Sequence, residues 1–281
     1  MAERWVQAPD GASLFVNDIG PADGPPVIVL HGGPAAHHDY LLPAFARLAD
    51  AFRLVLYDQR GGGRSRAAGD VPLDFDTQVA DVEAVILGSG LEAAHVVGYS
   101  FGGLIAMVFA ARHPDRVRKL ALCSSAPPHS GYRVPLERAL AAAQASPWVK
   151  EERRALEASG MRETLPEEYR RRRFSLSVAG YLADPRLCYA LTPFRIQARA
   201  ADIVRDSAAA RDLEAEVARL DGRGVLFIHG TADPIDPALL RPVAERIGAR
   251  FETVAGSGHV PYLEAPEPFF SILRGFLGEP T

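Results

Sequence analysis

Cysteine is almost absent from this sequence of 281 residues. Its two cysteines, Cys123 and Cys188, are too few for a disulfide framework and form no C-x-x-C pair. Neither a redox-active thiol pair nor a zinc site is indicated, and both residues are interpreted as small buried hydrophobes. The nucleotide-binding patterns G-x-G-x-x-G and G-x-x-x-x-G-K-S/T do not occur, which disfavours nucleotide binding. We expect neither a cofactor nor a metal.

The chain also has a small net charge and no long apolar run. The formal net charge is −4, and the single basic run, Arg170 to Arg173, lies beside Glu167 and Glu168. A solvent-exposed helix face with local ion pairs explains such a run. No apolar stretch approaches the roughly 20 residues that cross a bilayer, and the N-terminal residues lack the apolar segment of a secretion signal. We expect a cytoplasmic protein without a nucleic-acid or membrane partner; no oligomeric state is indicated.

Eight short runs rich in β-branched and aliphatic residues predict strands. The first two flank Pro9-Asp10-Gly11, a strong turn signal, and predict an antiparallel hairpin. The later six are rich in Val, Ile and Leu on both faces, as expected of buried parallel strands. The runs span residues 3–8, 13–18, 26–32, 52–59, 94–100, 119–125, 224–230 and 250–256.

Helical periodicity appears between several of these runs. Residues 77–87 place aliphatic side chains at helical spacing and are expected to turn Asp81 and Glu83 outward. Further helices are predicted at 103–112, 237–247 and 266–277. Alternating strands and helices indicate an α/β fold with a mostly parallel eight-stranded sheet and helices on both faces.

One long segment interrupts this alternation. Residues 126–220 contain no convincing buried parallel strand and predict several short helices inserted between two strands. The insertion is basic, because residues 127–200 carry 13 Arg and Lys against 8 Asp and Glu, whereas the rest of the chain has a net charge of −9. We interpret 126–220 as a helical cap, or lid, on a core formed by residues 1–125 and 221–281.

A serine stands in an unusually glycine-rich turn. Gly98-Tyr99-Ser100-Phe101-Gly102 fits G-x-S-x-G and lies between a predicted strand and a predicted helix. A nucleophile elbow needs this context: the turn is sharp, its central residue is strained, and the glycines leave room beside it. Ser100 would then project at the carboxyl end of its strand. The alternative is a glycine-rich turn with an incidental serine.

A serine nucleophile needs a base, usually a histidine that is held by a carboxylate. Among eight histidines, His259 is favoured because it lies in a loop after the last strand. His229 lies within a strand, where a packing role is favoured. The carboxylate should follow another parallel strand, between serine and histidine in chain order. Asp233 is preferred, and Asp236 beside Pro237 is interpreted as a helix cap.

The tetrahedral intermediate of acyl transfer needs backbone donors for its oxyanion. The N–H of Phe101, directly after the serine, is one candidate. The other lies in His31-Gly32-Gly33-Pro34, where glycines allow close approach to a ligand and Pro34 stiffens the loop. We prefer the N–H of Gly33 to that of Gly32, and interpret His31 as a brace for the loop.

Together these motifs resemble the α/β-hydrolase superfamily over nearly the whole chain. HGGP followed by HDYL, then YDQRGGGRS (residues 57–65) and G-x-S-x-G-G, is similar to the proline iminopeptidase group of serine peptidases. Those enzymes remove an N-terminal residue, often proline, from short peptides. The resemblance assigns the triad to Ser100, Asp233 and His259 and the oxyanion donors to Gly33 and Phe101.

The resemblance also implies a turn at residues 57–65 that shapes the floor of the site, with structural roles for Asp58 and Arg60. Two features depart from the group's pattern. Ala35 replaces the last glycine of its HGGPG motif, and the lid is net basic. Peptidases of the group hold the substrate ammonium with carboxylates, several of them on the lid, whereas a basic lid suits a neutral or anionic substrate better. The lid carboxylates that could still serve are Glu137, Glu163, Glu167 and Glu168.

We predict a serine hydrolase that cleaves a small ester, amide or short peptide through an acyl-enzyme intermediate. A proline iminopeptidase-like aminopeptidase is slightly favoured by HGGP. A carboxylesterase or lactonase is the main alternative, and carbon–carbon bond hydrolases share the scaffold. Dehalogenases and epoxide hydrolases would carry aspartate at position 100. A non-catalytic ligand-binding protein would lack a member of the triad, and here all three are present.

Overall fold

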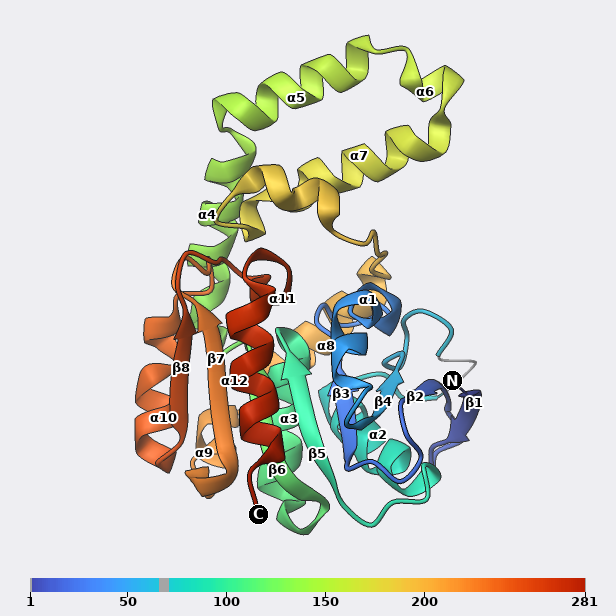
Figure 1. Ribbon diagram of the computed structural model, residues 1–281, viewed down its shortest axis with the longest axis vertical. Coiled ribbons are helices and arrows are strands. Elements are labelled where there is room, and N and C mark those ends of the chain that lie inside the picture. The colour runs from blue at the N-terminus through green and yellow to red at the C-terminus, as the bar shows by residue number, and fades with distance from the viewer. Residues whose placement is uncertain (1, 66–70, 281) are drawn as a thin grey trace.

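An eight-stranded sheet forms the centre of the molecule in a computed structural model that describes residues 2–65 and 71–280 (Figure 1). Its spatial order is β1-β2-β4-β3-β5-β6-β7-β8. The strands are β1 (Ala2–Gln7), β2 (Ser13–Ile19), β3 (Pro26–Leu30), β4 (Arg53–Tyr57), β5 (Ala94–Tyr99), β6 (Val117–Cys123), β7 (Val225–Gly230) and β8 (Arg250–Val254).

The direction of the strands follows the predicted scheme. β1 and β2 form an antiparallel hairpin, and β2 also pairs antiparallel with β4. From β4 to β8 every neighbouring pair is parallel. The predicted mostly parallel sheet of eight strands is therefore confirmed, and the carboxyl ends of β3, β5 and β7 lie at one edge.

Burial along the strands separates the central strands from the edge. Every residue of β3 and β5 is buried, which explains their nearly continuous apolar sequences. In β8 only Val254 is buried. The expectation that β8 is apolar on both faces is therefore wrong, because an edge strand has one neighbour and stays open to solvent.

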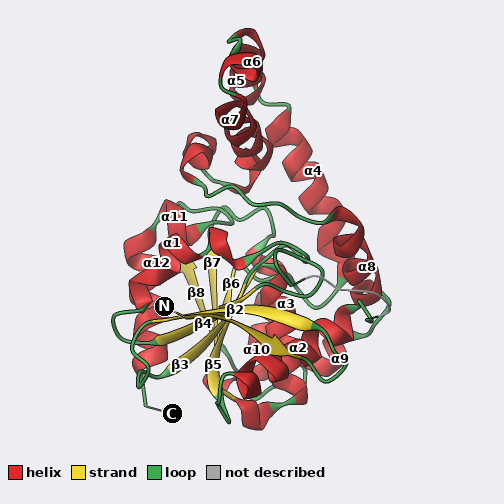
Figure 2. Cartoon of the chain, turned by 90° about the vertical axis from the view of Figure 1, so that its right-hand side faces the viewer, coloured by secondary structure: helices red, strands yellow, loops and turns green. Residues whose placement is uncertain are grey.

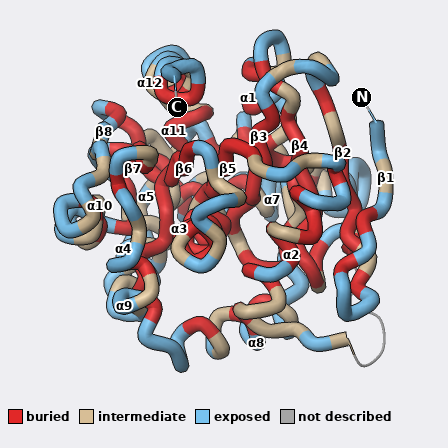
Figure 3. Tube along the Cα trace, turned by 90° about the horizontal axis from the view of Figure 1, so that it is seen from below, coloured by how far each residue is buried: buried red, intermediate tan, exposed pale blue. Residues whose placement is uncertain are grey.

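Helices cover both faces of the sheet (Figure 2). On one face the apolar cores of the long helices α2 and α3 pack together with α8, α9 and α10, and on the other face α1, α11 and α12 pack. Figure 3 shows that burial concentrates in the strands and in the inner sides of these helices. Their bounds are α1 (Leu42–Phe45), α2 (Phe75–Gly88), α3 (Phe101–Arg112), α8 (Ala198–Ala209), α9 (Leu213–Val217), α10 (Arg241–Ile247), α11 (Pro261–Glu264) and α12 (Pro266–Gly278).

The regular secondary structure between β6 and β7 consists of helices alone. α5, α6 and α7 project beyond the sheet, with α4 rising toward them (Figure 1). In contrast, α8 and α9 bury Val204, Ala208, Leu213 and Val217 in the same apolar cluster as α2 and α3. The end of the inserted segment thus packs as part of the core. The projecting helices are α4 (Arg133–Gln144), α5 (Pro147–Ala158), α6 (Met161–Thr164) and α7 (Pro166–Val178).

Both cysteines are buried free thiols, as predicted. In the part of the chain that the structure describes, no helix is long and apolar enough to cross a membrane.

Asp81 of α2 does not face solvent as expected from the helical pattern, and that prediction is wrong. Asp81 is buried and accepts two hydrogen bonds from the guanidinium of Arg60, at 2.6 and 3.0 Å. The same guanidinium contacts the carboxylate of Asp10 and donates to Pro72 O over 2.8 Å. A buried carboxylate is found at a nominally polar helix position because its partner comes from a distant loop, which sequence periodicity does not report. Arg60 therefore has the structural role that the resemblance implied.

Asp81→Ala is expected to destabilise the fold strongly, by about 3 kcal/mol, because the Arg60 charge would lose its buried partner. Urea unfolding followed by circular dichroism measures this change in the free energy of unfolding. Glu83→Ala on the same helix is the matched control: Glu83 is only part-buried and pairs with Arg116, so a cost below about 1 kcal/mol is expected. Equal costs for the two variants would contradict this interpretation.

Candidate active site

Ser100 occupies a sharp turn between β5 and α3. Its backbone has φ +55° and ψ −121°, a conformation that non-glycine residues rarely adopt. Ser100 N–H donates to Cys123 O of the neighbouring strand β6, and Ser100 O accepts from the N–H groups of Gly103 and Ala126. These bonds hold the strained turn in place, as a nucleophile elbow requires.

The glycines around the serine are required by space. A Cβ atom on Gly98 would lie 2.6 Å from Gly102 O, and one on Gly102 would lie 2.4 Å from His31 O. Both contacts are with backbone, which cannot move away as a flexible side chain could. The prediction that side chains here would collide with their neighbours is confirmed.

The structure brings Ser100, His259 and Asp233 together. His259 Nε2 lies 2.9 Å from Ser100 Oγ, and His259 Nδ1 lies 2.9 and 3.1 Å from the two carboxylate oxygens of Asp233. Asp236, the alternative carboxylate, instead accepts the N–H of Ala238 and caps the short turn that begins at Pro237. This geometry lets His259 accept the serine proton through Nε2 while Asp233 fixes the opposite nitrogen.

Asp233 is almost completely buried, yet it is suited to remain ionised. Burial opposes ionisation, but the neighbouring His259 and His229 outweigh it and lower the pKa of Asp233 to about 2. The Ile235 N–H also donates to Asp233 Oδ1, at 2.8 Å. His229 is buried in β7, stacked on Phe251, with Nδ1 3.7 Å from Asp233 Oδ2. The packing role expected for His229 therefore includes electrostatic support of this carboxylate.

Two candidate oxyanion donors lie close to Ser100: Phe101 directly follows it at the start of α3, and Gly33 lines the same cavity as Ser100. Gly32 donates its N–H to Tyr40 Oη over 2.7 Å. The N–H groups of Gly33 and Phe101, by contrast, donate to no other described residue. Gly32 also approaches the nucleophile closely, because a Cβ on it would lie 2.7 Å from Ser100 Cβ. This arrangement favours Gly33 and Phe101 as the pair of oxyanion donors.

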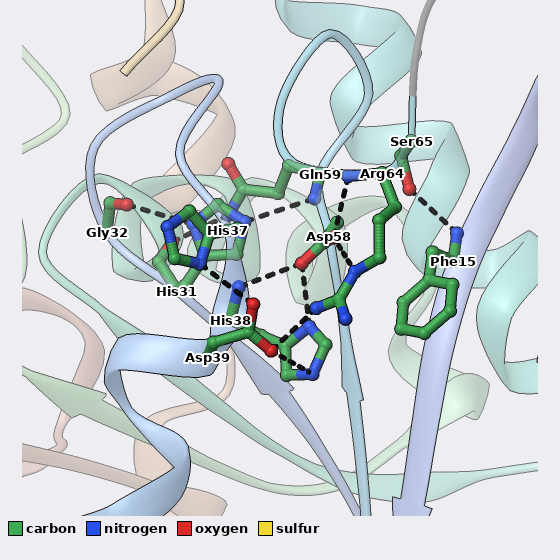
Figure 4. Close-up of polar contacts among 10 residues, drawn as sticks. All are labelled: Phe15, His31, Gly32, His37, His38, Asp39, Asp58, Gln59, Arg64 and Ser65. Carbon is green, nitrogen blue, oxygen red and sulfur yellow. Dashed lines mark hydrogen bonds and ion pairs between the residues drawn. The ribbon is translucent and has the colours of Figure 1, made fainter. Parts of the chain in front are cut away.

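His31 fixes the loop that carries Gly33 (Figure 4). The Gln59 N–H donates to His31 Nε2 over 3.1 Å, so Nδ1 carries the proton and donates to Gly32 O at 2.9 Å. Burial lowers the pKa of His31 to about 4, and the ring is neutral at pH 7. The neutral ring thus links the loop at 31–34 to the turn at 57–65.

The position after Pro34 departs from the HGGPG pattern, and its backbone explains why glycine is common there. Ala35 has φ +61°, in the left-handed region that glycine enters without strain. Ala35 O also accepts the N–H of Gln197, from the segment that leads into α8. Alanine is the smallest residue that retains a Cβ, so the loop keeps its shape with limited strain.

Asp58 is the centre of the polar network beneath this loop (Figure 4). Its Oδ1 accepts the backbone N–H of His38 and contacts His38 Nδ1, at 2.9 and 2.7 Å. Its Oδ2 accepts the N–H and Nε–H of Arg64, at 2.9 and 3.0 Å. Burial opposes its ionisation, but the hydrogen bonds and charges of His38 and Arg64 hold the pKa of Asp58 well below its ordinary value. The structural role implied for Asp58 is to join these two loops.

Acid is expected to destabilise the protein through Asp58. Because its pKa is depressed in the folded state, the unfolded chain binds the extra proton, and the stabilisation is lost as the pH falls below about 4. Asp58→Asn should lower the free energy of unfolding at pH 7. It should also make the fall of that free energy between about pH 5 and pH 3 less steep, because the variant takes up to about one proton fewer on unfolding. Urea unfolding across this range measures the slope. An unchanged slope in the variant would exclude Asp58 as the source.

Residues 25–266 match the sequence family described as the alpha/beta hydrolase fold. The chain belongs to this family. Its match covers the elbow, both loops that carry candidate oxyanion donors, and the positions of Asp233 and His259. Membership supports hydrolase chemistry and leaves the substrate undetermined.

Individual relatives in the alpha/beta hydrolase family have several activities. The chain is 38% identical over 125 residues to the bifunctional esterase/perhydrolase DCH of Acinetobacter calcoaceticus, covering 44% of this chain and 45% of that protein. It is 38% identical over 120 residues to the proline iminopeptidase of Neisseria meningitidis serogroup A, covering 42% of this chain and 38% of that protein. The aligned part thus spans less than half of these relatives' length.

Solved structures resemble nearly the whole chain. The esterase EaEST from Exiguobacterium antarcticum superimposes with a TM-score of 0.71 at 23% identity, covering 99% of this chain and 100% of that one. Proline iminopeptidase from Mycobacterium smegmatis gives a TM-score of 0.68 at 25% identity, covering 98% and 97%. The predicted fold and the resemblance to proline iminopeptidases are both confirmed.

A cavity of about 380 Å³, here named the inner pocket, opens beside Ser100. Among the described residues that line it, none is Asp, Glu, Lys or Arg. Burial raises the pKa of Tyr40 and of Tyr99 well above the ordinary value, so both hydroxyls stay protonated. The inner pocket is lined by Gly32, Gly33, Tyr40, Tyr99, Ser100, Phe174, Ser177, Val178, Tyr181, Leu191, Phe194, Ile196, His259, Val260 and Tyr262.

A second cavity, of about 1010 Å³, adjoins the inner pocket and is here named the outer cleft. The two cavities share Phe174 and Phe194, whose ring centroids lie 5.1 Å apart. Unlike the inner pocket, the outer cleft is rich in charge. It is lined by His37, Gly63, Thr164, Leu165, Pro166, Glu167, Glu168, Arg170, Arg171, Phe174, Pro193, Phe194, Arg195 and Gln197.

Several supporting residues escaped the sequence-based analysis. Tyr40 Oη binds both the N–H and the carbonyl oxygen of Gly32. The His259 N–H donates to Tyr181 O at 2.7 Å, and Glu264 accepts the N–H of Gly258 at 2.8 Å. Tyr181 belongs to the segment between β6 and β7, so that segment directly positions the histidine loop. The only available signal was the position of Tyr40 within the HDYL motif.

The four lid glutamates considered as ammonium ligands do not reach the inner pocket. Glu167 and Glu168 line the outer cleft, whereas Glu137 and Glu163 line neither cavity. Among residues 2–65 and 71–280, no group of three or more His, Cys, Asp or Glu side chains is arranged to hold a metal ion.

Proposed function

We propose that the protein is a serine hydrolase for carboxylic esters with small neutral acyl groups. Ser100 is the nucleophile, His259 the general base and acid, and Asp233 the carboxylate that orients His259. Gly33 and Phe101 donate their backbone N–H groups to the oxyanion. The observation that carries the proposal is the Ser100–His259–Asp233 geometry at the wall of an uncharged pocket.

In the acylation half of the reaction, Ser100 Oγ bonds to the carbonyl carbon while His259 Nε2 takes the serine proton. The carbonyl oxygen becomes an oxyanion between the N–H groups of Gly33 and Phe101. The C–O bond to the alcohol then breaks, and His259 gives its proton to the departing oxygen. The acyl group remains on Ser100.

In the deacylation half, water takes the place of the alcohol beside His259. His259 Nε2 accepts a proton from water as the water oxygen bonds to the acyl carbon. The Ser100–acyl bond breaks, and the proton returns to Ser100 Oγ. The acid product leaves and the triad is restored.

The inner pocket favours esters over free-amine peptides. An N-terminal ammonium placed at Ser100 would lose hydration without gaining a carboxylate partner, a costly burial. Two of the candidate lid carboxylates, Glu167 and Glu168, lie in the outer cleft and already pair with Arg170, Arg171 and Arg172. A lactone, which is a cyclic ester, satisfies the same requirement as an open ester.

The second candidate is a proline iminopeptidase-like aminopeptidase. The HGGP motif, the 38% identity to a proline iminopeptidase and the overall likeness to a solved one favour it. For this function the substrate ammonium would have to reach past Phe174 and Phe194 to the outer cleft. The lack of a carboxylate in the inner pocket makes it second to the esterase.

Paired assays distinguish the two functions. We expect the wild-type protein to hydrolyse p-nitrophenyl butyrate and to leave proline p-nitroanilide uncleaved, because only the first substrate has a neutral group for the inner pocket. Ser100→Ala is the control for hydrolysis that does not depend on the triad. Cleavage of the prolyl anilide that disappears in Ser100→Ala would establish the aminopeptidase instead. Wild-type protein silent on both would contradict the proposal and favour a binding-only protein.

We also propose that residues 126–220 serve as a cap on a core of residues 1–125 and 221–281, with α4–α7 as its mobile part. Phe174 and Val178 of α7 and Tyr181 after it line the inner pocket. A shift of these helices would therefore widen or close access to Ser100. α8 and α9 share the apolar core and would stay fixed.

A further inference from the structure

Helix α7 changes character along the face that lines the two cavities. Glu167, Arg170 and Arg171 line the outer cleft, and Ser177 and Val178 line the inner pocket. Phe174, between these groups, lines both. Residues spaced by three or four lie on one side of a helix. One wall therefore runs from a charged end to an apolar end beside the nucleophile.

Residues 193–197, which precede α8 and lie outside any helix or strand, also line both cavities, and their side chains alternate between the two. Phe194 and Ile196 reach the inner pocket, whereas Arg195 lines the outer cleft. The Gln197 N–H donates to Ala35 O over 3.1 Å, which ties the segment to the loop that carries Gly33. Arg195 thus lies between Phe194 and Ile196, two residues that line the inner pocket.

Arg195 differs from the other arginines of the outer cleft in its partners. Arg170 pairs with Glu167, and Arg171 with Glu168. Arg195 makes neither an ion pair nor a side-chain hydrogen bond with any residue in the ranges 2–65 and 71–280. The two carboxylates that line the outer cleft therefore pair with arginines of the same helix. The charge of Arg195 is not neutralised by either of them in an ion pair. A concave site with this excess charge attracts an anion.

The order of product release determines which part of an ester lies in the outer cleft. In the proposed mechanism the alcohol leaves while the acyl group is still bonded to Ser100. The alcohol must therefore lie on the side with access to solvent, and the acyl group on the enclosed side. The outer cleft is the larger cavity, about 1010 Å³ against about 380 Å³, and its arginines are exposed, whereas Tyr40, Tyr99 and Tyr262 of the inner pocket are buried. On this argument the alcohol of the substrate is assigned to the outer cleft, beside Arg195.

We propose that the outer cleft is an anion subsite in which Arg195 binds a carboxylate on the alcohol part of the substrate. The preferred substrate class is then an ester of a small apolar acid with an alcohol or phenol that carries a carboxylate. This inference rests on the proposed ester hydrolysis for its catalytic readout. Arginine suits the role, because its planar guanidinium donates two parallel hydrogen bonds to a carboxylate.

Two aryl acetates that differ in one charge test the subsite. The anionic ester is 4-acetoxy-3-nitrobenzoate, and the neutral one is 4-acetoxy-3-nitrobenzamide; both release a coloured nitrophenolate. The ratio of their kcat/KM values is divided by the ratio of their hydroxide-catalysed rates, which removes intrinsic reactivity. We expect the corrected ratio to favour the anion about tenfold in the wild type. It should fall toward one at 0.5 M NaCl, a concentration chosen so that the screening length is only about 4 Å.

Single substitutions test whether Arg195 causes the preference for the anionic ester. Arg195→Gln should remove about tenfold from the corrected ratio, and Arg195→Lys should retain part of it. Arg154→Gln, which removes an exposed charge from α5 outside both cavities, is the matched control and should keep the wild-type ratio. Because each ratio is internal to one enzyme preparation, it does not depend on the active fraction. The same ratio in wild type and Arg195→Gln would overturn the proposal.

Binding of 4-hydroxy-3-nitrobenzoate, measured by titration calorimetry, separates this proposal from the proposed function. Binding that is weakened about tenfold in Arg195→Gln supports the subsite even if neither acetate is hydrolysed, in which case only the ester hydrolase proposal fails. Hydrolysis of both acetates with equal binding of the product to wild type and Arg195→Gln would overturn the subsite alone.

Discussion

Ser100→Ala is expected to reduce kcat for p-nitrophenyl butyrate by at least about 10³-fold, because it removes the hydroxyl that lies 2.9 Å from His259 Nε2. The small loss of side-chain volume should leave the fold unchanged. The free energy of unfolding should also change little, because the strained backbone conformation at position 100 persists in the variant. Steady-state rates of the purified variant, corrected for spontaneous hydrolysis, measure the effect.

Ser159→Ala is the matched control for this prediction. Ser159 lies exposed at the end of α5, far in sequence from the elbow, and its hydroxyl donates to Leu156 O and accepts the N–H of Met161. The same atom is removed, and kcat should stay within about twofold because surface substitutions have small effects. If Ser100→Ala retained most of the wild-type rate, hydrolysis would have to proceed at another residue.

Asp233→Asn is expected to reduce kcat by about 10³- to 10⁴-fold with a much smaller change in KM. The asparagine amide would turn its donor toward His259 Nδ1, and the ring would then carry its proton on Nε2, where it cannot accept the proton of Ser100. The substitution also removes the carboxylate whose low pKa keeps a negative charge beside the ring. Rates and thermal unfolding of the same preparation separate catalytic loss from unfolding.

Asp236→Asn gives this experiment its control, since Asp236 was the alternative carboxylate in the sequence. It caps a short turn through the N–H of Ala238 and does not contact His259. We expect kcat within about threefold of wild type and at most a loss of about 1 kcal/mol in stability. A larger catalytic loss in Asp236→Asn than in Asp233→Asn would show that the triad is assigned to the wrong aspartate.

Most of the fold could be predicted from the spacing of residues that lie close together in the sequence. Strands β3 to β7 follow from continuous apolar runs, and the elbow from glycines at 98 and 102. Ser100, Asp233 and His259 each follow a predicted strand, and a parallel sheet brings the carboxyl ends of its strands to one edge. These features depend on backbone geometry within a few residues, which a single sequence records directly.

Other features depend on partners far away in the chain and could not be found this way. The Arg60 guanidinium turns Asp81 inward, and the position of β8 at the edge exposes most of that strand. The packing of α8 on α2 and the tie between Tyr181 and His259 likewise arise only in the folded chain. The same holds for the lack of Asp and Glu among the described residues that line the inner pocket, on which the proposed preference for esters rests.

Covalent labelling with a fluorophosphonate tests the central claim, that Ser100 is an activated nucleophile, most directly. Such a reagent bonds to a serine oxygen when a neighbouring base removes the proton and fluoride leaves. We predict one label per chain, found by mass spectrometry on the peptide that contains Ser100, with labelling lost in Ser100→Ala and slowed by at least about 10²-fold in His259→Ala. Labelling at another residue, or an unlabelled Ser100 in a protein that hydrolyses esters, would contradict the account.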